Sequence, residues 1–383
     1  MNKWKLTFGI VAAIALSTGS GTASALKESH ILLNYKETSL GSSQIIVEST
    51  TLVPLKSLAA DMGYTLSWDQ KSKTAKLVRP EREVVFIVNS TAAKVNGTSL
   101  TLSKTPRILK GSVYVPLVSA VSALGGKTWF DKNDGNLHIV DEPRYTVSSI
   151  QGRSYWVSQK SGDLYYKPSA SGNMVQIGQL PMKGTTYNHF FEIKNMGNGI
   201  DYLTLTDKHY AMFNNFDNVF QLLVQDGEIV KQMDVHMMTS ATYQSAPRIE
   251  TTQLYMTDGS SVQYINQDGS LGKLLALEEL TGKSGLFTVE YAEKDIALVR
   301  SKDTTQLYAI HIATDEVANL SEQLISSEDR KEWDRADGSD AYYLSKMLVL
   351  KKREGNVLTF QYNPLPDGAV KQVTYTLNGQ KND

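Results

Sequence analysis

The feature that most constrains the fold of this chain is an internal duplication in its first half. The segment Val53-Pro54-Leu55 recurs as Val115-Pro116-Leu117, at an offset of 62 residues. Further matches keep the same offset without a gap: Gly63 with Gly125, Trp68-Asp69 with Phe130-Asp131, and Leu77-Val78 with Ile139-Val140. Self-similarity at one fixed offset is the signature of a repeated structural unit. We therefore predict two copies of one unit that pack together as a single module.

Each copy is predicted to form a helix. A proline is tolerated at the start of a helix, because the first N–H groups have no helical partner. A glycine at the end permits the positive φ that a helix C-terminus favours. The apolar positions between them recur at i, i+3, i+4 and i+7, which is one helix face: Leu55, Leu58, Ala59 and Met62 in the first copy, and Leu117, Ala120, Val121 and Leu124 in the second.

A hairpin is expected after each helix. Its strands are predicted at Thr65–Trp68 and Thr74–Val78 in the first copy, and at Thr128–Phe130 and Leu137–Val140 in the second. Between the copies, Val84–Val88 and Lys94–Leu102 alternate like a further hairpin, with Asn96-Gly97 as a strong two-residue turn signal. The first half is therefore predicted to be a compact α+β domain made of two helix-plus-hairpin units.

This repeated residue pattern resembles that of a known family. The pattern Val-Pro-Leu, a helix ending in Leu/Met-Gly, and then aromatic-Asp before a polar turn occurs twice, with Val95-Asn96-Gly97 between. It is similar to the copper amine oxidase N-terminal-like family, or stalk domain, over about residues 30–142. The resemblance implies an accessory module found on many exported Gram-positive proteins, with the oxidase chemistry in a different domain. The family usually has Arg after Val-Pro-Leu, whereas this chain has Lys56 and Val118.

The resemblance does not extend to amine oxidase activity. That chemistry needs three histidine ligands for copper, two of them as His-x-His, and a tyrosine that becomes the quinone cofactor. The histidines of this chain are His30, His138, His189, His209, His236 and His311, and none forms His-x-His. We therefore predict that the protein is not an amine oxidase.

The N-terminus predicts export. In residues 1–25, Lys3 and Lys5 precede the apolar run Leu6–Leu16, and Ala23-Ser24-Ala25 forms a small-residue cleavage site. An N-terminal membrane anchor is the alternative, but the run is shorter than the about 20 residues that a spanning helix needs. We expect a signal peptide, a mature chain that begins at Leu26, and no membrane span after cleavage. The protein is predicted to be secreted or held non-covalently at the cell surface.

Composition excludes several kinds of protein. The chain has no cysteine, which excludes disulfides, a lipid-modified cysteine and thiolate metal sites. Lys and Arg total 39 against 40 Asp and Glu, so no basic surface for nucleic acid or anionic lipid is expected.

The second half, residues 143–383, is predicted to be all β. Five units of strand, turn, strand, Asp-Gly-type turn and strand recur: Tyr155–Ile177, Tyr210–Met233, Leu254–Leu275, Ile296–Leu320 and Met347–Val373. A further strand precedes most of them: Tyr145–Ile150, Ile200–Thr206, Phe287–Tyr291 and Ala341–Leu344. Four short strands in about 50 residues are typical of propeller blades, which leave only short exposed edges. We predict a five-bladed β-propeller, following the signal peptide at 1–25 and the stalk domain at 26–142. Two stacked β-sandwich sheets are the alternative.

Two segments interrupt the strand pattern. Leu274–Leu280 and Ser321–Arg335 are predicted to be helical. The second is interpreted as a solvated insertion between the fourth and fifth blades. Its Trp333 is predicted to pin the insertion to the body, with ligand stacking as the alternative.

Two local patterns suggest metal-binding sites. The segment Asp131-x-Asn133-Asp134-Gly135-Asn136 imitates the start of a calcium loop, with Glu142 at the twelfth position. A hairpin turn is the favoured interpretation, because Leu137–Val140 is expected to be a strand. Met233, His236, Met237 and Met238 could suit copper(I), but methionine is also a common core residue. We therefore assign no catalytic, cofactor-binding or metal-binding residues, and expect no cofactor.

The predicted function is non-catalytic binding or scaffolding at the cell envelope, with a cell-wall polymer or an envelope protein as the partner. The alternative is a propeller-type glycoside hydrolase acting on envelope or environmental polysaccharide, because spacing along the chain does not reveal whether two carboxylates meet in space. A sensor or regulator module is a third hypothesis. Fold alone does not separate these functions.

Overall fold

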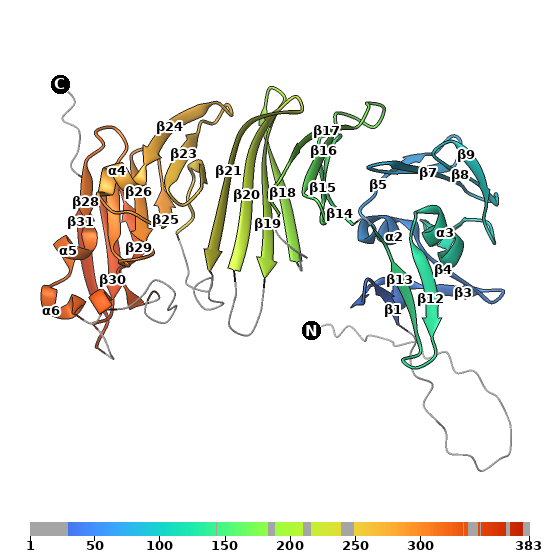
Figure 1. The fold of residues 1–383 in the computed structure, drawn as a ribbon, viewed down its shortest axis with the longest axis horizontal. Helices are drawn as coiled ribbons and strands as arrows, with labels where there is room; N and C mark the ends of the chain where they lie inside the picture. The colour runs from blue at the N-terminus through green and yellow to red at the C-terminus, as the bar shows by residue number, and fades with distance from the viewer. Residues whose placement is uncertain are drawn as a thin grey trace, which may run out of the picture.

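The computed structural model describes residues 30–142, 144–182, 188–209, 216–238, 249–331, 333–335, 344, 346–364 and 368–377. The predicted signal peptide lies outside these ranges. The chain is mostly β-strand, arranged in many small sheets (Figure 1). In the part of the chain that is described, no helix has the length and apolar character to cross a membrane.

Residues 30–142, which we call the N-terminal module, surround one hydrophobic core that draws on both copies, from Ile31 to Ile139. One sheet has the order β10-β11-β4-β3 (Arg107–Leu109, Ser112–Pro116, Thr50–Pro54, Ile45–Val47). The second runs β5-β6-β7-β8-β9 (Thr65–Asp69, Thr74–Arg79, Arg82–Ile87, Ala92–Val95, Thr98–Thr101). The third is β12-β13-β1-β2 (Lys127–Asp131, Asn136–Val140, Ile31–Leu33, Lys36–Glu37). The helices are α1 (Leu40–Ser43), α2 (Leu55–Asp61) and α3 (Leu117–Ala123).

The two copies pack against each other as predicted. The helices α2 and α3, and the strands β4 and β11, begin and end at positions 62 residues apart. Strand β4 pairs antiparallel with β11, so that Val53 lies opposite its own equivalent, Val115. Equivalent residues facing each other is the geometry of a twofold axis. The predicted helices and hairpins are therefore present, and the copies share one core.

A buried arginine ties the ends of the two helices together. The Arg79 guanidinium donates to both carboxylate oxygens of Asp141, at 2.9 and 2.7 Å. It also donates to the carbonyl oxygens of Met62 at 3.1 Å and Leu124 at 3.2 Å. Met62 and Leu124 are the C-caps of α2 and α3. One cation therefore satisfies carbonyls that each helix end would otherwise leave without a partner.

The rest of the chain forms five consecutive antiparallel sheets, numbered here from first to fifth. The first is β14–β17 (Tyr145–Ile150, Arg153–Ser158, Asp163–Lys167, Val175–Gln179) and the second β18–β21 (Asn188–Gly197, Ile200–His209, Phe216–Gln225, Glu228–Met238). The third is β22–β24 (Leu254–Thr257, Ser261–Ile265, Leu271–Ala276) and the fourth β25–β28 (Phe287–Ala292, Ile296–Ser301, Leu307–His311, Val317–Asn319). The fifth is β29–β31 (Val349–Glu354, Val357–Tyr362, Lys371–Thr376).

The five sheets lie in a row that starts at the N-terminal module and ends near the C-terminus (Figure 1). Separate hydrophobic clusters join the first sheet to the second, the second to the third, the third to the fourth and the fourth to the fifth. In the fifth sheet, β30 alternates buried Leu358, Phe360 and Tyr362 with partly exposed residues. That alternation is expected of a sheet with one face in solvent. A closed five-bladed ring is therefore not confirmed.

The N-terminal module is joined to the first sheet by a buried contact. The Trp156 indole N–H donates to the carbonyl oxygen of Gly63 at 3.1 Å, and Trp156 is fully buried. Gly63 has a φ of +69°, and a β-carbon there would lie 2.4 Å from the Tyr145 carbonyl oxygen. Glycine is therefore required at this position both by backbone conformation and by the close approach of β14.

Short helices occur near the predicted positions, with different bounds. The helix expected at Leu274–Leu280 begins later, as α4 (Leu277–Thr281), because β24 continues to Ala276. The segment Ser321–Arg335 holds α5 (Leu320–Leu324), α6 (Ser327–Arg330) and the 3₁₀ turn η2 (Trp333–Arg335).

The second segment is not simply solvated, because its Ser321 and Ile325 are buried. Trp333 packs edge-on against Tyr362 at 5.5 Å in the same cluster, which confirms the pinning role. Of the strand predicted at Ala341–Leu344, residues 341–343 lie outside the described ranges and Leu344 is helical.

Candidate functional site

One face of the sheet β12-β13-β1-β2 gathers aromatic rings beside acidic groups. Trp129 of β12 lies opposite His138 of β13, and their rings stack at 5.0 Å. Tyr35, in the turn between β1 and β2, approaches both rings edge-on, at 6.5 Å from Trp129 and 6.2 Å from His138. Tyr35 is 74% exposed and Trp129 39%, whereas His138 is buried. We call Tyr35, Trp129, Asp131, Asp134 and His138 the aromatic–acidic face.

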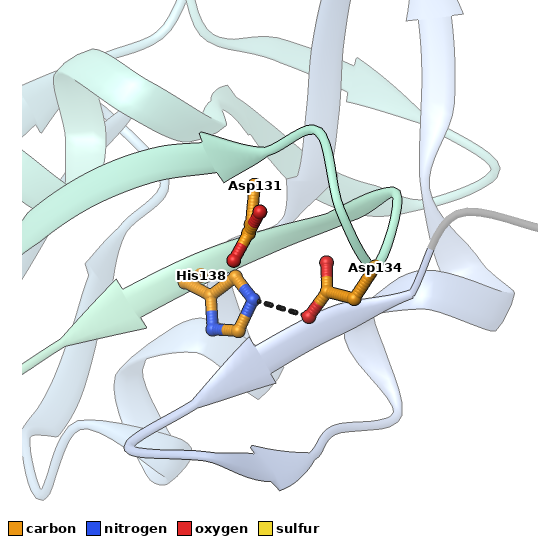
Figure 2. Close-up of side chains that lie close together, drawn as sticks. All are labelled: Asp131, Asp134 and His138. Carbon is orange, nitrogen blue, oxygen red and sulfur yellow. Dashed lines mark hydrogen bonds and ion pairs between the residues drawn. The ribbon is translucent and has the colours of Figure 1, made fainter.

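The hairpin turn after β12 brings two carboxylates to His138. Figure 2 shows the side chains of Asp131, Asp134 and His138 pointing toward one another. Asp134 Oδ2 and His138 Nε2 are 2.8 Å apart, and one ligand atom from each of the three residues lies within 4.8 Å of the others. The backbone N–H of Asn136, followed by the contact with His138, lowers the pKa of Asp134. This carboxyl group is therefore ionised at neutral pH.

The turn matches the interpretation made from sequence, but His138 was not part of it. Asp131 accepts a hydrogen bond from the backbone N–H of Asn133 at 2.8 Å, which is the local bonding expected of Asp in a turn. The signal for His138 was its position two residues after Asn136, on the same face of a strand. Two carboxylates and an imidazole offer oxygen and nitrogen ligands suited to a divalent cation. Glu142 is not a member of this group.

The equivalent sheet, β5 to β9, shows that the fold does not require these side chains. At the offset of 62 residues, Ser67 replaces Trp129, Ser72 replaces Asp134 and Lys76 replaces His138. The aromatic–acidic face is therefore specific to one of the two related sheets.

The backbone of Tyr35 has a conformation that favours glycine. Its φ is +68°, and its equivalent in the other sheet is Gly97, with a φ of +81°. A side chain at positive φ costs about 1 kcal/mol relative to glycine. Tyr35 is therefore present against the local preference of the turn.

Residues 32–139 match the family model of the copper amine oxidase N-terminal domain. This match confirms the resemblance seen in the sequence. All five residues of the aromatic–acidic face lie inside the matched region. The copper amine oxidase N-terminal domain is not itself catalytic; the prediction that the whole protein is non-catalytic stays a prediction.

Solved structures resemble the chain only weakly. A chain of a nidogen/laminin complex is 11% identical, with 72% of this chain and 86% of that chain covered and a TM-score of 0.20. AztD from Citrobacter koseri is 9% identical, with 74% and 85% covered and a TM-score of 0.20. Its apo form has the same identity and coverage and a TM-score of 0.19. No curated protein matches the chain.

The methionine–histidine cluster suggested by the sequence does not assemble around Met233 and His236. Met233 is buried against Met256 between the second and third sheets. His236 is exposed and is hydrogen-bonded to Asn218. Residues three apart on a strand point to opposite faces. The side chains of Met237 and Met238 lie outside the described residues.

Proposed function

We propose that the protein is a non-catalytic, exported envelope protein that binds a cell-wall polymer or an envelope protein through the aromatic–acidic face. The observation that carries the proposal is Tyr35, an exposed ring held beside Trp129 in a turn whose equivalent uses glycine. Exposed Tyr and Trp side chains give large contact areas at a low cost in side-chain entropy. The neighbouring carboxylates supply acceptors for hydroxyl, amide or ammonium groups of a partner.

Export and surface location belong to the same proposal. They are supported by the signal-peptide pattern of residues 1–25 and by the resemblance of residues 32–139 to an accessory domain. The chain also lacks cysteine, so that its stability does not depend on an oxidising compartment.

The five C-terminal sheets act, in this proposal, as a scaffold of propeller-type blades attached to an α+β stalk domain. The support is their construction: each is an antiparallel meander of three or four strands, and successive sheets pack face to face. The buried Trp156 contact couples this scaffold to the N-terminal module.

A retention assay on purified cell-wall material tests the proposal. Full-length mature protein is expected to bind, and Trp129→Ala and Tyr35→Gly are each expected to lose retention. Trp68→Ala is the matched control, because Trp68 is also 39% exposed but lies on the equivalent sheet. Wild-type protein that stays in solution and recovers no envelope partner would contradict the proposal. Equal loss in all three variants would contradict the assignment to this face.

The glycoside hydrolase alternative remains a prediction. It requires two carboxylates about 5 to 9.5 Å apart at a scissile bond, which a propeller would place near its central axis. The five sheets lie in a row, so the described residues provide no ring axis at which to seek that pair. Release of reducing ends from wall polysaccharide by the purified protein would favour it.

A further inference from the structure

Two aspartates are buried on one face of β19 in the second sheet. Asp201 and Asp207 are both fully buried. Leu203 and Leu205 lie between them on the same face and pack in the cluster that joins the first and second sheets. A buried carboxylate is costly unless cations or hydrogen-bond donors compensate it. The two aspartates meet this requirement in different ways.

Asp201 is compensated by an arginine. Arg153 donates to both of its carboxylate oxygens at 2.7 Å. The Tyr155 hydroxyl donates at 2.8 Å and the Asn195 side-chain amide at 3.0 Å. The charge of this carboxylate therefore has a permanent positive partner.

Asp207 lies instead between two imidazoles. His209 Nε2 is 2.7 Å from Asp207 Oδ2, and His189 Nε2 is 3.5 Å from Oδ1. The Asn218 side-chain amide donates to Oδ2 at 3.3 Å. In the described part of the chain, Asp207 therefore pairs with two histidines and an asparagine and with no lysine or arginine.

The His189 side of this cluster is unsatisfied. His189 Nε2 and Asp207 Oδ1 are buried atoms that make no hydrogen bond, and the His189 side chain is only 4% exposed. The other ring nitrogen, Nδ1, is 2.9 Å from the Thr146 hydroxyl oxygen, which also accepts from Gln159 at 3.1 Å. When Nδ1 carries the proton and donates to Thr146, Nε2 presents a lone pair to the carboxylate. Two acceptors then face each other without a proton between them.

That arrangement is the one expected of a metal-binding imidazole. A ligating histidine holds its second ring nitrogen on a polar partner, which fixes the tautomer and the ring orientation. Thr146 does this from β14 of the first sheet, whereas His189 lies on β18 of the second. On the other side, Phe216 stacks on the His209 ring at 4.2 Å and shields it.

We propose that His189, Asp207 and His209 bind a divalent transition-metal ion of the zinc type between the first and second sheets. Zinc takes imidazole nitrogen and carboxylate oxygen at about 2.0–2.2 Å, and three protein ligands leave one position for water. The two imidazoles approach different oxygens of the carboxylate, at 3.5 and 2.7 Å. The three ligand atoms do not yet all lie within 4.8 Å of one another, so the two rings move toward each other as the ion binds. The ion supplies the positive charge that Arg153 supplies to Asp201. All three ligands lie on the second sheet, and the ion fixes the His189 ring that Thr146 of the first sheet contacts.

Metal binding by the full-length mature chain tests this proposal. After removal of metals with a chelator, equilibrium dialysis against Zn²⁺ alone is expected to load one ion per chain and to raise the unfolding temperature. His189→Gln and His209→Gln are each expected to weaken binding at least tenfold. Thr146→Val keeps all three ligands but removes the hydroxyl that contacts His189 Nδ1 and Gln159, and it is expected to weaken binding about tenfold. His311→Gln is the control, because His311 bonds Tyr375 elsewhere in the chain, and its binding should equal that of the wild type.

A second readout needs no variant. Co²⁺ in place of Zn²⁺ is expected to show the intense visible absorption of a four-coordinate ion with nitrogen ligands. The proposal is overturned if the wild type binds no Zn²⁺, or if bound Co²⁺ keeps the weak spectrum of the hydrated ion. It is also overturned if both glutamine variants bind normally while Asp134→Asn loses the ion, since the metal would then lie on the aromatic–acidic face.

Discussion

Replacing Asp141 by Asn tests whether the buried Arg79–Asp141 pair holds the duplicated copies together. Both side chains are only 3% exposed, so the variant keeps the shape but leaves the guanidinium without a counter-charge. Removing one partner of a buried ion pair costs about 3–5 kcal/mol. The carbonyls of Met62 and Leu124 still accept from Arg79. We therefore expect the lower end of the range, about 3 kcal/mol of unfolding free energy.

The assay is equilibrium urea unfolding near neutral pH. The midpoint urea concentration of the N-terminal module is compared between variants whose free energy of unfolding depends on urea concentration with the same slope. Lys76→Gln is the control, because it breaks the Lys76–Glu83 pair, whose side chains are 42% and 46% exposed. An exposed pair contributes at most about 1 kcal/mol. The double variant Arg79→Met/Asp141→Leu is expected to lose less than the sum of its single variants, since no lone charge remains buried.

The reasoning about Arg79 fails if Asp141→Asn costs no more than Lys76→Gln. It also fails if the double variant loses the full sum, because the two residues would then act independently.

Three further predictions concern other contacts. Gly63→Ala is expected to lower the free energy of unfolding by more than about 1 kcal/mol, because positive φ is combined with a 2.4 Å approach to a backbone carbonyl. Calorimetry should show a smaller loss of stability for Gly125→Ala, whose new β-carbon meets a movable side chain. Trp156→Phe leaves the Gly63 carbonyl without its donor and is expected to cost about 1–3 kcal/mol, measured by urea unfolding. The hydrogen bond from Lys371 lowers the pKa of Asp329. The contribution of this carboxylate to folding stability is therefore full above the unfolded pKa of about 3.9 and is lost as pH falls through the lower folded pKa. Hydrogen exchange in α6 should therefore distinguish Asp329→Asn from the wild type near neutral pH and not in strong acid.

The N-terminal module was the part of the fold most open to prediction. Its helices and hairpins depend on signals within a few residues, such as Pro54 at a helix start and Asn96-Gly97 in a tight turn, and the duplication repeats those signals. The arrangement of the five sheets depends on which faces remain exposed. That is a property of contacts between distant strands, so the small antiparallel sheets were anticipated and their arrangement in a row was not.

The candidate sites likewise depend on contacts between distant strands, which local sequence signals do not reveal. Tyr35 lies in a turn without the Asn-Gly signal that marks its equivalent, and only the register of β1 against β13 brings it to Trp129. His189 meets Asp207 because β18 pairs with β19 in one particular register. The strand β18 was missed, and with it the neighbour of the buried carboxylate. Residue types suggested chemistry, but pairing across strands decided which of them meet.

The opposition of Val53 and Val115 has a consequence for the origin of the N-terminal module. A shorter chain carrying a single copy would present the β4 edge with no equivalent strand to cover it. Two such chains could satisfy each other's edge by the same antiparallel pairing, as a symmetric homodimer. Fusion of the two genes would then convert an association that depends on protein concentration into one that does not.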